Sequence, residues 1–281
     1  MRRLRAGKLL LAALLIAGLL AGCAPGNTQS SSENVDLNLH CFSAGKADAF
    51  LLWTEDSAVL IDTGEKGFGK EILAYLQEQG IDKLDALIIS HFDKDHVGGA
   101  AKILKNIEVG AVYQSNYPKD SSEYENYLEA LELAEVTPVT VTSDTVLSIG
   151  GVSYAIDAPA QSEYAVDPSN NSSLIVTATD GSCRLLFMGD AEDARISEYL
   201  AQSAQSCSFL KVPYHGHWQE MLPELLEAVD PQIAVITSSD EIPEDIETVE
   251  ALETAGARVL LTREAAWDLV CDGEQIKIVE E

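Results

Sequence analysis

The chain has few basic residues. Its 281 residues include 18 Lys and Arg against 46 Asp and Glu, giving a formal net charge of −28. Proteins that bind a nucleic-acid backbone without regard to sequence neutralise many phosphates with Lys and Arg. This scarcity, together with long-range repulsion of polyanions, argues against stable binding to duplex nucleic acid.

The chain also lacks an apolar run of the roughly 20 residues that a membrane-spanning helix needs. Residues 9–22 are apolar but too short, and they follow a basic region at residues 2–8, as in a secretory signal. The run ends in Leu20-Ala21-Gly22-Cys23. This tetrapeptide resembles a bacterial lipoprotein cleavage box, in which the Cys becomes the lipidated first residue. The alternative is an ordinary secretory signal with an incidental Cys.

Three segments follow from this interpretation: a signal peptide (1–22), a flexible Ser-rich tether that starts with the lipidated Cys23 (23–34), and one domain (35–281). Removal of the signal peptide deletes four basic residues and no acid, which takes the net charge from −28 to −32. The predicted location is the extracytoplasmic face of the cell membrane, with a lipid as the anchor.

Close Cys-x-x-Cys spacing is missing. Cys41, Cys183, Cys207 and Cys271 each lie in or beside an apolar, strand-like run. An oxidising compartment would allow disulfides, but sequence does not give their pairing. We expect buried free thiols rather than a disulfide framework or a metal cluster.

From residue 35 onward, short β-like runs alternate with amphipathic helices, which predicts an α/β (α+β) fold. Residues 57–62 (SAVLID) and 85–90 (DALIIS) are nearly continuous apolar runs, as buried strands require. Helices are expected at 69–79, 99–106, 121–134, 193–204, 222–228 and 244–254. Two β-rich halves that each carry helices fit two packed sheets with helices outside.

Four potential metal ligands follow the strand at 85–90 within six residues: His91, Asp93, Asp95 and His96. The first two are two residues apart and can converge on one point, while the second two, where the chain turns into a helix, can face a second point. Two-metal hydrolytic sites hold their ions about 3.5–4 Å apart, so a compact ligand loop suits them. Gly98 and Gly99 allow close approach of the backbone.

This loop resembles the HxHxDH signature of the metallo-β-lactamase superfamily in the HxDxDH form of ComEC-type DNA-uptake proteins. Four further segments resemble motifs of these proteins in the same order: residues 45–49 (GKADA), 62–64 (DTG), 186–192 (LFMGDAE) and 210–216 (LKVPYHG). The resemblance covers the chain from about residue 35 to its end. It implies a four-layer αββα sandwich that holds two divalent metal ions, zinc or manganese.

Carried over residue by residue, the resemblance assigns His91 and Asp93 to a first metal. It assigns Asp95, His96 and His215 to a second metal, and a bridging position to Asp190. Two-metal sites activate water for hydrolysis, and Asp95 would orient that water and accept its proton.

The chain departs from the family pattern at several positions. It has no His between His96 and His215, and the stretch 170–174 (NNSSL) stands there instead; Asn171 is a candidate for metal or substrate contact, and an ordinary turn is equally expected. Tyr214 replaces the first His of HHG and His217 replaces a Ser. The segment 238–243 (SSDEIP) stands where these proteins have a GHP motif, and it lacks the His. His217 is a candidate to contact the substrate in place of that His.

Three functions remain open: hydrolysis of phosphodiesters, hydrolysis of another bond (lactone, amide or β-lactam), and metal binding without catalysis. The motifs favour the first, with a small or short substrate because of the acidic charge. Lys46, Lys94 and Lys211 are the basic residues nearest the metal motifs and could hold one or two phosphates. Tyrosines at 113, 117, 124 and 127 could offer a base-stacking surface, but we favour ordinary packing of helix-face aromatics on the domain.

The predicted anchor is testable. Replacement of Cys23 by Ala should abolish lipid attachment and lipoprotein-type cleavage, because nothing after it is long and apolar enough to insert. Metabolic labelling with a fatty acid measures this. Equal labelling of the variant and the wild type would contradict the lipoprotein interpretation.

Overall fold

The structure, a computed structural model, describes residues 36–202 and 204–279. The predicted signal peptide, the tether and Cys23 lie outside the described residues. Within the described part of the chain, no helix combines the length and apolar character needed to cross a membrane.

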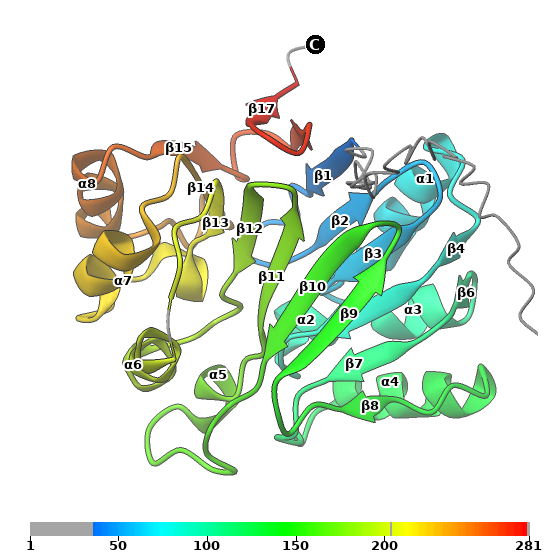
Figure 1. The fold of residues 1–281 in the computed structure, drawn as a ribbon. Helices are drawn as coiled ribbons and strands as arrows, with labels where there is room; N and C mark the ends of the chain where they lie inside the picture. Colours follow the sequence, from blue (N-terminus) through cyan, green and yellow to red (C-terminus); the bar gives the residue numbers. More distant parts are fainter. Residues whose placement is uncertain (1–35, 203, 280–281) are drawn as a thin grey trace, which may run out of the picture. The chain divides into compact units, whose positions relative to one another are not determined.

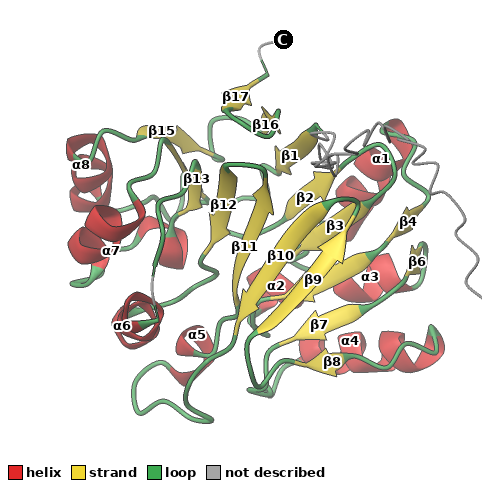
Figure 2. Cartoon of the chain, in the orientation of Figure 1, coloured by secondary structure: helices red, strands yellow, loops and turns green. Residues whose placement is uncertain are grey.

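Two large sheets form the centre of the domain (Figures 1 and 2). The eight-stranded sheet has the order β17 (Ile276–Ile278), β16 (Trp267–Cys271), β1 (Leu37–Cys41), β2 (Phe50–Trp53), β3 (Ala58–Ile61), β5 (Ala86–Ile89), β7 (Val112–Gln114), β8 (Val139–Thr140). The seven-stranded sheet has the order β15 (Arg258–Leu261), β14 (Ile233–Ile236), β13 (Phe209–Lys211), β12 (Cys183–Phe187), β11 (Ile175–Asp180), β10 (Val152–Asp157), β9 (Thr145–Ile149). A small parallel pair joins β4 (Lys83–Leu84) and β6 (Glu108–Val109).

Helices cover the outer face of each sheet. The larger sheet packs against α1 (Gly69–Glu78), α3 (Ala100–Leu104) and α4 (Ser122–Leu133), and the smaller sheet against α6 (Asp193–Ala201), α7 (Leu222–Val229) and α8 (Ile246–Thr254). Figure 1 shows these two sets of helices on opposite sides of the paired sheets. Three single-turn elements remain: α2 (Lys94–Val97), α5 (Pro168–Asn171) and the 3-10 helix η1 (Pro213–Gly216). The predicted four-layer αββα sandwich is confirmed.

Local sequence explains these elements. The strands β3, β5 and β14 are buried along their whole length, because one face meets the other sheet and the other face meets helices. The helix α4 begins after Ser121, whose Oγ accepts a hydrogen bond from the Tyr124 backbone N–H at 3.2 Å, an N-cap that satisfies an otherwise unpaired donor. Apolar side chains between the sheets, such as Leu185 and Val235, form the central core.

The topology brings several loops to one edge of the sandwich. The strands β3, β5, β7 and β8 run parallel to one another in the larger sheet, as do β12 to β15 in the smaller one. The loops that leave the carboxyl ends of parallel strands gather at one edge of a sheet, where binding sites form. The predicted metal motifs follow β5, β12 and β13.

Most predicted helices and strands are present, with shorter ends. The helix expected at 193–204 ends at Ala201, and the one expected at 244–254 begins at Ile246. The short strand β7 was not predicted, because three residues are too few to show a period.

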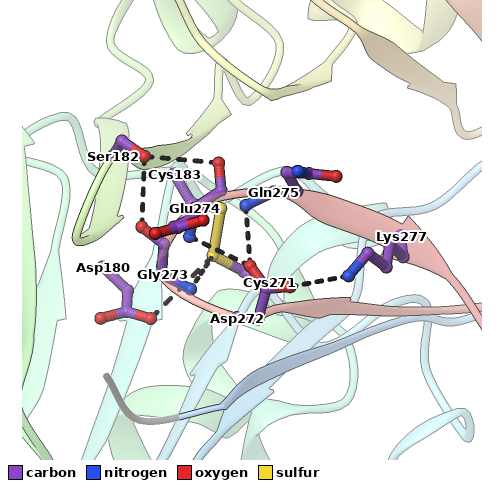
Figure 3. The surroundings of a disulfide bond; sticks show 9 residues. All are labelled: Asp180, Ser182, Cys183, Cys271, Asp272, Gly273, Glu274, Gln275 and Lys277. Carbon is purple, nitrogen blue, oxygen red and sulfur yellow. Dashed lines mark hydrogen bonds and ion pairs between the residues drawn. A yellow bond between two sulfur atoms is a disulfide. The ribbon is translucent and has the colours of Figure 1, made fainter. Parts of the chain in front are cut away.

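The prediction of free thiols is wrong for two of the four cysteines. Cys183 and Cys271 form a disulfide, while Cys41 and Cys207 are free and buried. The bond joins β12 of one sheet to β16 of the other, between residues 88 positions apart (Figure 3). Beside it the Ser182 backbone N–H donates to the Gly273 carbonyl at 2.8 Å, so two hairpins from different sheets meet here.

Loss of this disulfide should destabilise the domain. Because the bond closes a loop of this length, its removal in a Cys183→Ala/Cys271→Ala variant should lower the free energy of unfolding by about 2–5 kcal/mol. Denaturant unfolding of the purified protein measures the change. Cys207→Ala is the matched control, because it also removes a buried sulfur but breaks no bond. Equal stability of the double variant and this control would contradict a structural role.

Candidate metal centre

Side chains from both sheets meet at the carboxyl edge. His91 follows β5 and His96 lies in α2, both from the larger sheet, while Asp190 follows β12 and His215 lies in η1, both from the smaller sheet. All four are almost fully buried. Asp190 Oδ2 lies 3.0 Å from His215 Nε2, 3.3 Å from His96 Nε2 and 4.0 Å from His91 Nε2.

The two acidic residues of the loop lie at the two ends of this cluster. Asp95 Oδ2 is 3.5 Å from His215 Nε2, and Asp93 Oδ1 is 3.9 Å from His91 Nε2. The structure therefore brings all six predicted ligands together. Asp93 lies on the His91 side and Asp95 on the His215 side, while His91, His96 and Asp190 form one group whose ligand atoms could hold a single ion.

Gly98 and Gly99 allow the ligand loop to pack against a neighbouring turn. A Cβ at Gly98 would lie 2.5 Å from the Lys66 backbone nitrogen, and one at Gly99 would lie 2.2 Å from the Thr63 carbonyl oxygen. Only glycine fits these approaches. The helix α2 is thereby fixed beside the turn after β3, which brings Asp62 close to His96.

Asp62 fixes the orientation of His96. Its Oδ2 lies 2.9 Å from His96 Nδ1 and accepts a hydrogen bond from Ser90 Oγ at 2.6 Å, while its Oδ1 accepts one from the Ser90 backbone N–H at 2.8 Å. Burial lowers the pKa of His96, but Asp190, Asp48 and Asp62 raise it well above the ordinary value. A metal needs the neutral ring, whose Nε2 lone pair points toward Asp190 when the proton is on Nδ1. A carboxylate behind a histidine is a common support of metal ligands. The DTG motif points to this residue, but its role was not predicted.

Thr237 and Asp48 fix the orientation of His215. His215 Nδ1 lies 3.1 Å from the Thr237 carbonyl oxygen and 2.9 Å from its Oγ1, which donates to Asp48 Oδ1 at 2.7 Å. His215 and the preceding Tyr214 adopt φ of +54° and +48°, a left-handed conformation that residues other than glycine seldom adopt. The loop geometry aims Nε2 at the cluster.

The three Nε2 atoms provide a test of fit for a metal. Among the described residues, those of His91, His96 and His215 have no hydrogen-bond partner although they are buried, and a buried polar atom normally has one. Ligand atoms about 2.0–2.2 Å from a tetrahedral zinc lie roughly 3.4 Å apart, close to the separations between His96, His215 and Asp190. The residues fit a divalent metal.

A second group of possible ligands fits less well. Asp48, His96 and His215 also approach one another, but through the Nδ1 atoms that face Asp62 and Thr237. Asp48 is moreover paired with Lys211, whose Nζ lies 2.6 Å from Oδ2. The ammonium already supplies the positive charge that a metal would bring there.

Burial and neighbouring charges set the protonation of the cluster. Burial, with His96 nearby, lowers the pKa of His91 to about 4, so this imidazole is neutral at physiological pH, as metal binding requires. Burial alone would raise the pKa of Asp190, but His215, His96 and Lys211 hold it well below the ordinary value. Asp190 is therefore an ionised carboxylate, the form that coordinates cations.

Two predicted substrate residues are buried and paired within the protein. Lys211 is fully buried, and its ammonium contacts Asp48 and the Gly189 carbonyl oxygen at 2.8 Å. Asn171 is buried too; its amide donates to two carbonyl oxygens of its own loop and its Oδ1 accepts from the Arg195 backbone N–H. These polar groups are satisfied within the protein, so we correct both assignments.

The other candidates lie at the rim of the centre. The side chain of His217 is 27% exposed, and its ring lies 5.2 Å from that of Tyr214. Lys46 Nζ lies 3.1 Å from Asp95 Oδ2 and 6.0 Å from the Tyr214 ring. Lys94 lies on the surface with a 72% exposed side chain, 4.0 Å from Glu65, so it is not part of the cluster.

Comparison with known proteins agrees with the geometry. Residues 43–238 match the profile of the Metallo-beta-lactamase superfamily. The chain belongs to this superfamily. Its members are typically metal-dependent hydrolases, and the matched range includes every residue of the proposed centre.

The relatives include proteins named for competence. The chain is 33% identical to Recombination protein 2 of Haemophilus influenzae (69% of this chain, 23% of the relative) and 28% identical to ComE operon protein 3 of Bacillus subtilis (74% and 29%). It is 26% identical to Competence protein ComA of Neisseria gonorrhoeae (78% and 29%). The chain thus matches between a fifth and a third of the length of these relatives.

Solved structures show the same fold. The protein YhfI of Bacillus subtilis aligns with a TM-score of 0.54 at 12% identity, covering 80% of this chain and 96% of its own. The metallo hydrolase Igni18 of Ignicoccus hospitalis aligns with a TM-score of 0.51 at 16% identity, covering 88% and 99%.

The metal assignment predicts how single substitutions change metal content. The protein should bind close to two divalent ions. Asp190→Ala should disturb both ions because its carboxylate lies between the two ligand groups, and His91→Ala should empty mainly one. Elemental analysis of the full-length protein in detergent measures both. Full occupancy in Asp190→Ala would show that Asp190 does not bridge.

Proposed function

We propose that this protein is a binuclear metal-dependent hydrolase of phosphodiesters with small or short substrates. The observation that carries the proposal is the convergence on Asp190 of three buried imidazole nitrogens that have no hydrogen-bond partner in the described part of the chain, with Asp93 and Asp95 at either end. His91, Asp93 and Asp190 would hold one ion, and Asp95, His96, His215 and Asp190 the other. Zinc and manganese both suit this set of imidazoles and carboxylates.

Bound divalent metals lower the pKa of water and polarise a phosphoryl oxygen. The protein residues supply orientation and proton transfer. Asp95 is partly open to solvent, with an 11% exposed side chain, so its carboxylate can reach a water at the mouth of the site and accept its proton. Lys46, 3.1 Å from Asp95, places a positive charge where a phosphate oxygen would develop negative charge.

Charge supports a short substrate. The protein carries a net charge of −28, and the partly exposed lysines in contact with the ligand carboxylates are few, so a long polyanion would be repelled. The relatives named for recombination and competence support a nucleic-acid-derived phosphodiester. The site's acidity instead favours a hydrolase of lactones, amides or β-lactams, which is the second candidate.

We also propose that Cys23 anchors the protein to the extracytoplasmic face of the membrane. The support is the sequence alone: a basic region, a short apolar run and Leu20-Ala21-Gly22-Cys23. The Cys183–Cys271 disulfide agrees with an oxidising compartment.

The proposed activity predicts metal-dependent turnover of a chromogenic phosphodiester and of a short single-stranded oligonucleotide. Asp95→Ala should lower kcat at least about a hundredfold, because it removes the general base. Full-length protein in detergent, loaded with zinc or manganese, is assayed beside Asp56→Ala, which changes an exposed carboxylate that is not among the proposed ligands.

Two outcomes would redirect the proposal. Turnover of lactones or β-lactams without cleavage of either phosphodiester would favour the second candidate. Two bound metals without turnover of any substrate would indicate a non-catalytic metal-binding protein.

A further inference from the structure

A cavity of about 480 Å³ opens beside Asp93. One wall is the loop after β7. The other wall is the end of the loop before α5 together with α5 itself. The lining residues are Asp93, Tyr117, Pro118, Lys119, Asp120, Asp167, Pro168, Ser169 and Asn170. Pockets that hold small ligands have volumes of about 300–1,000 Å³. Asp93 is shared between the cavity and the proposed metal centre.

Lys119 is the one basic side chain in the lining. Its Nζ lies 2.6 Å from Asp93 Oδ1, and its side chain is 35% exposed. An ammonium has three donors, so Lys119 keeps donors for a ligand in the cavity. Asp93 also accepts a hydrogen bond from Ser169 Oγ. The ammonium is therefore fixed at the boundary between the metal centre and the cavity.

The remaining lining is unsuited to a second phosphate. Tyr117, Pro118 and Pro168 offer flat apolar surfaces, while Asp120 and Asp167 are exposed carboxylates. Carboxylates accept hydrogen bonds from hydroxyl and amino groups and repel further anions. An aromatic ring such as that of Tyr117 stacks on a nucleobase. The other tyrosines of this stretch pack in the core, with Tyr124 4.4 Å from Phe92 between ring centroids.

We propose that this cavity binds the nucleoside part of a small phosphodiester, with Lys119 holding the phosphate at the metal centre. The base lies against Tyr117, and sugar or base donors face Asp120 and Asp167. The inference rests on the proposed phosphodiesterase function and specifies its substrate as nucleotide-sized, with one phosphate.

Two substrates with the same leaving group test the proposal: the p-nitrophenyl ester of thymidine 5′-phosphate, and methyl p-nitrophenyl phosphate, which lacks the nucleoside. Lys119→Ala should raise KM about tenfold for both, because it removes a charge-assisted contact to phosphate. Tyr117→Ala should raise KM about tenfold for the nucleoside substrate alone. Lys119→Arg keeps the positive charge, so its KM for both substrates should stay close to that of the wild type. Lys102→Ala, on the exposed face of α3, is the lysine control.

Metal content of every variant is measured in parallel, which separates an effect on the cavity from an effect on metal loading; among the described residues no hydrogen bond joins Tyr117 to a proposed ligand. Unchanged KM values in Lys119→Ala and Tyr117→Ala, with the wild type active, would overturn the cavity assignment and leave the phosphodiesterase standing. An inactive wild type would overturn the phosphodiesterase itself. Calorimetry with thymidine 5′-monophosphate then decides the cavity: binding lost in Tyr117→Ala supports it, and wild type that does not bind overturns it.

Discussion

The site depends on the cost of burying carboxylates together. Asp48, Asp62 and Asp190 lie almost fully buried at the junction of the two sheets, where unpaired charge is strongly disfavoured. Lys211 offsets the charge of Asp48 at 2.6 Å, and His96 lies between Asp62 and Asp190. The three imidazole nitrogens that face Asp190 have no partner among the described residues. The carboxylates supply negative charge and the imidazole nitrogens supply lone pairs. A divalent cation satisfies both.

Local patterns predicted the α/β class and the loop that carries His91, Asp93, Asp95 and His96, whereas the four-layer arrangement and the roles of Asp190 and His215 came from the resemblance to metallo-β-lactamase motifs. A buried apolar strand followed at once by His91 and Asp93 places them at a sheet edge, whatever the rest of the chain does. The motif around Asp190 gives the same information for the second sheet. That these residues bind metal remains a prediction, which their mutual distances fit.

The contacts that were missed or misassigned depend on long-range packing. The pairing of Cys183 with Cys271 follows from how two sheets stack, across 88 residues. Lys119 reaches Asp93 only because the three-residue strand β7 carries the following loop to the same edge. Lys211 looked like a substrate contact because it lies in a metal motif, but it ends a strand on its buried side. Pattern alone does not tell a buried lysine from an exposed one.

The strand β12 is connected to the opposite sheet near both of its ends. Cys183 begins it with a covalent link to the opposite sheet, and Asp190 follows its last residue in a cluster shared by both sheets. The strand is five residues long, about 17 Å, and Asp190 lies three residues beyond its end. If the centre holds metal, each end of β12 depends on a different chemical condition: an oxidising environment for the disulfide and a supply of metal for the centre. Maturation of this protein would then depend on its surroundings as well as on its chain, while the apolar core between the sheets holds them together in either case.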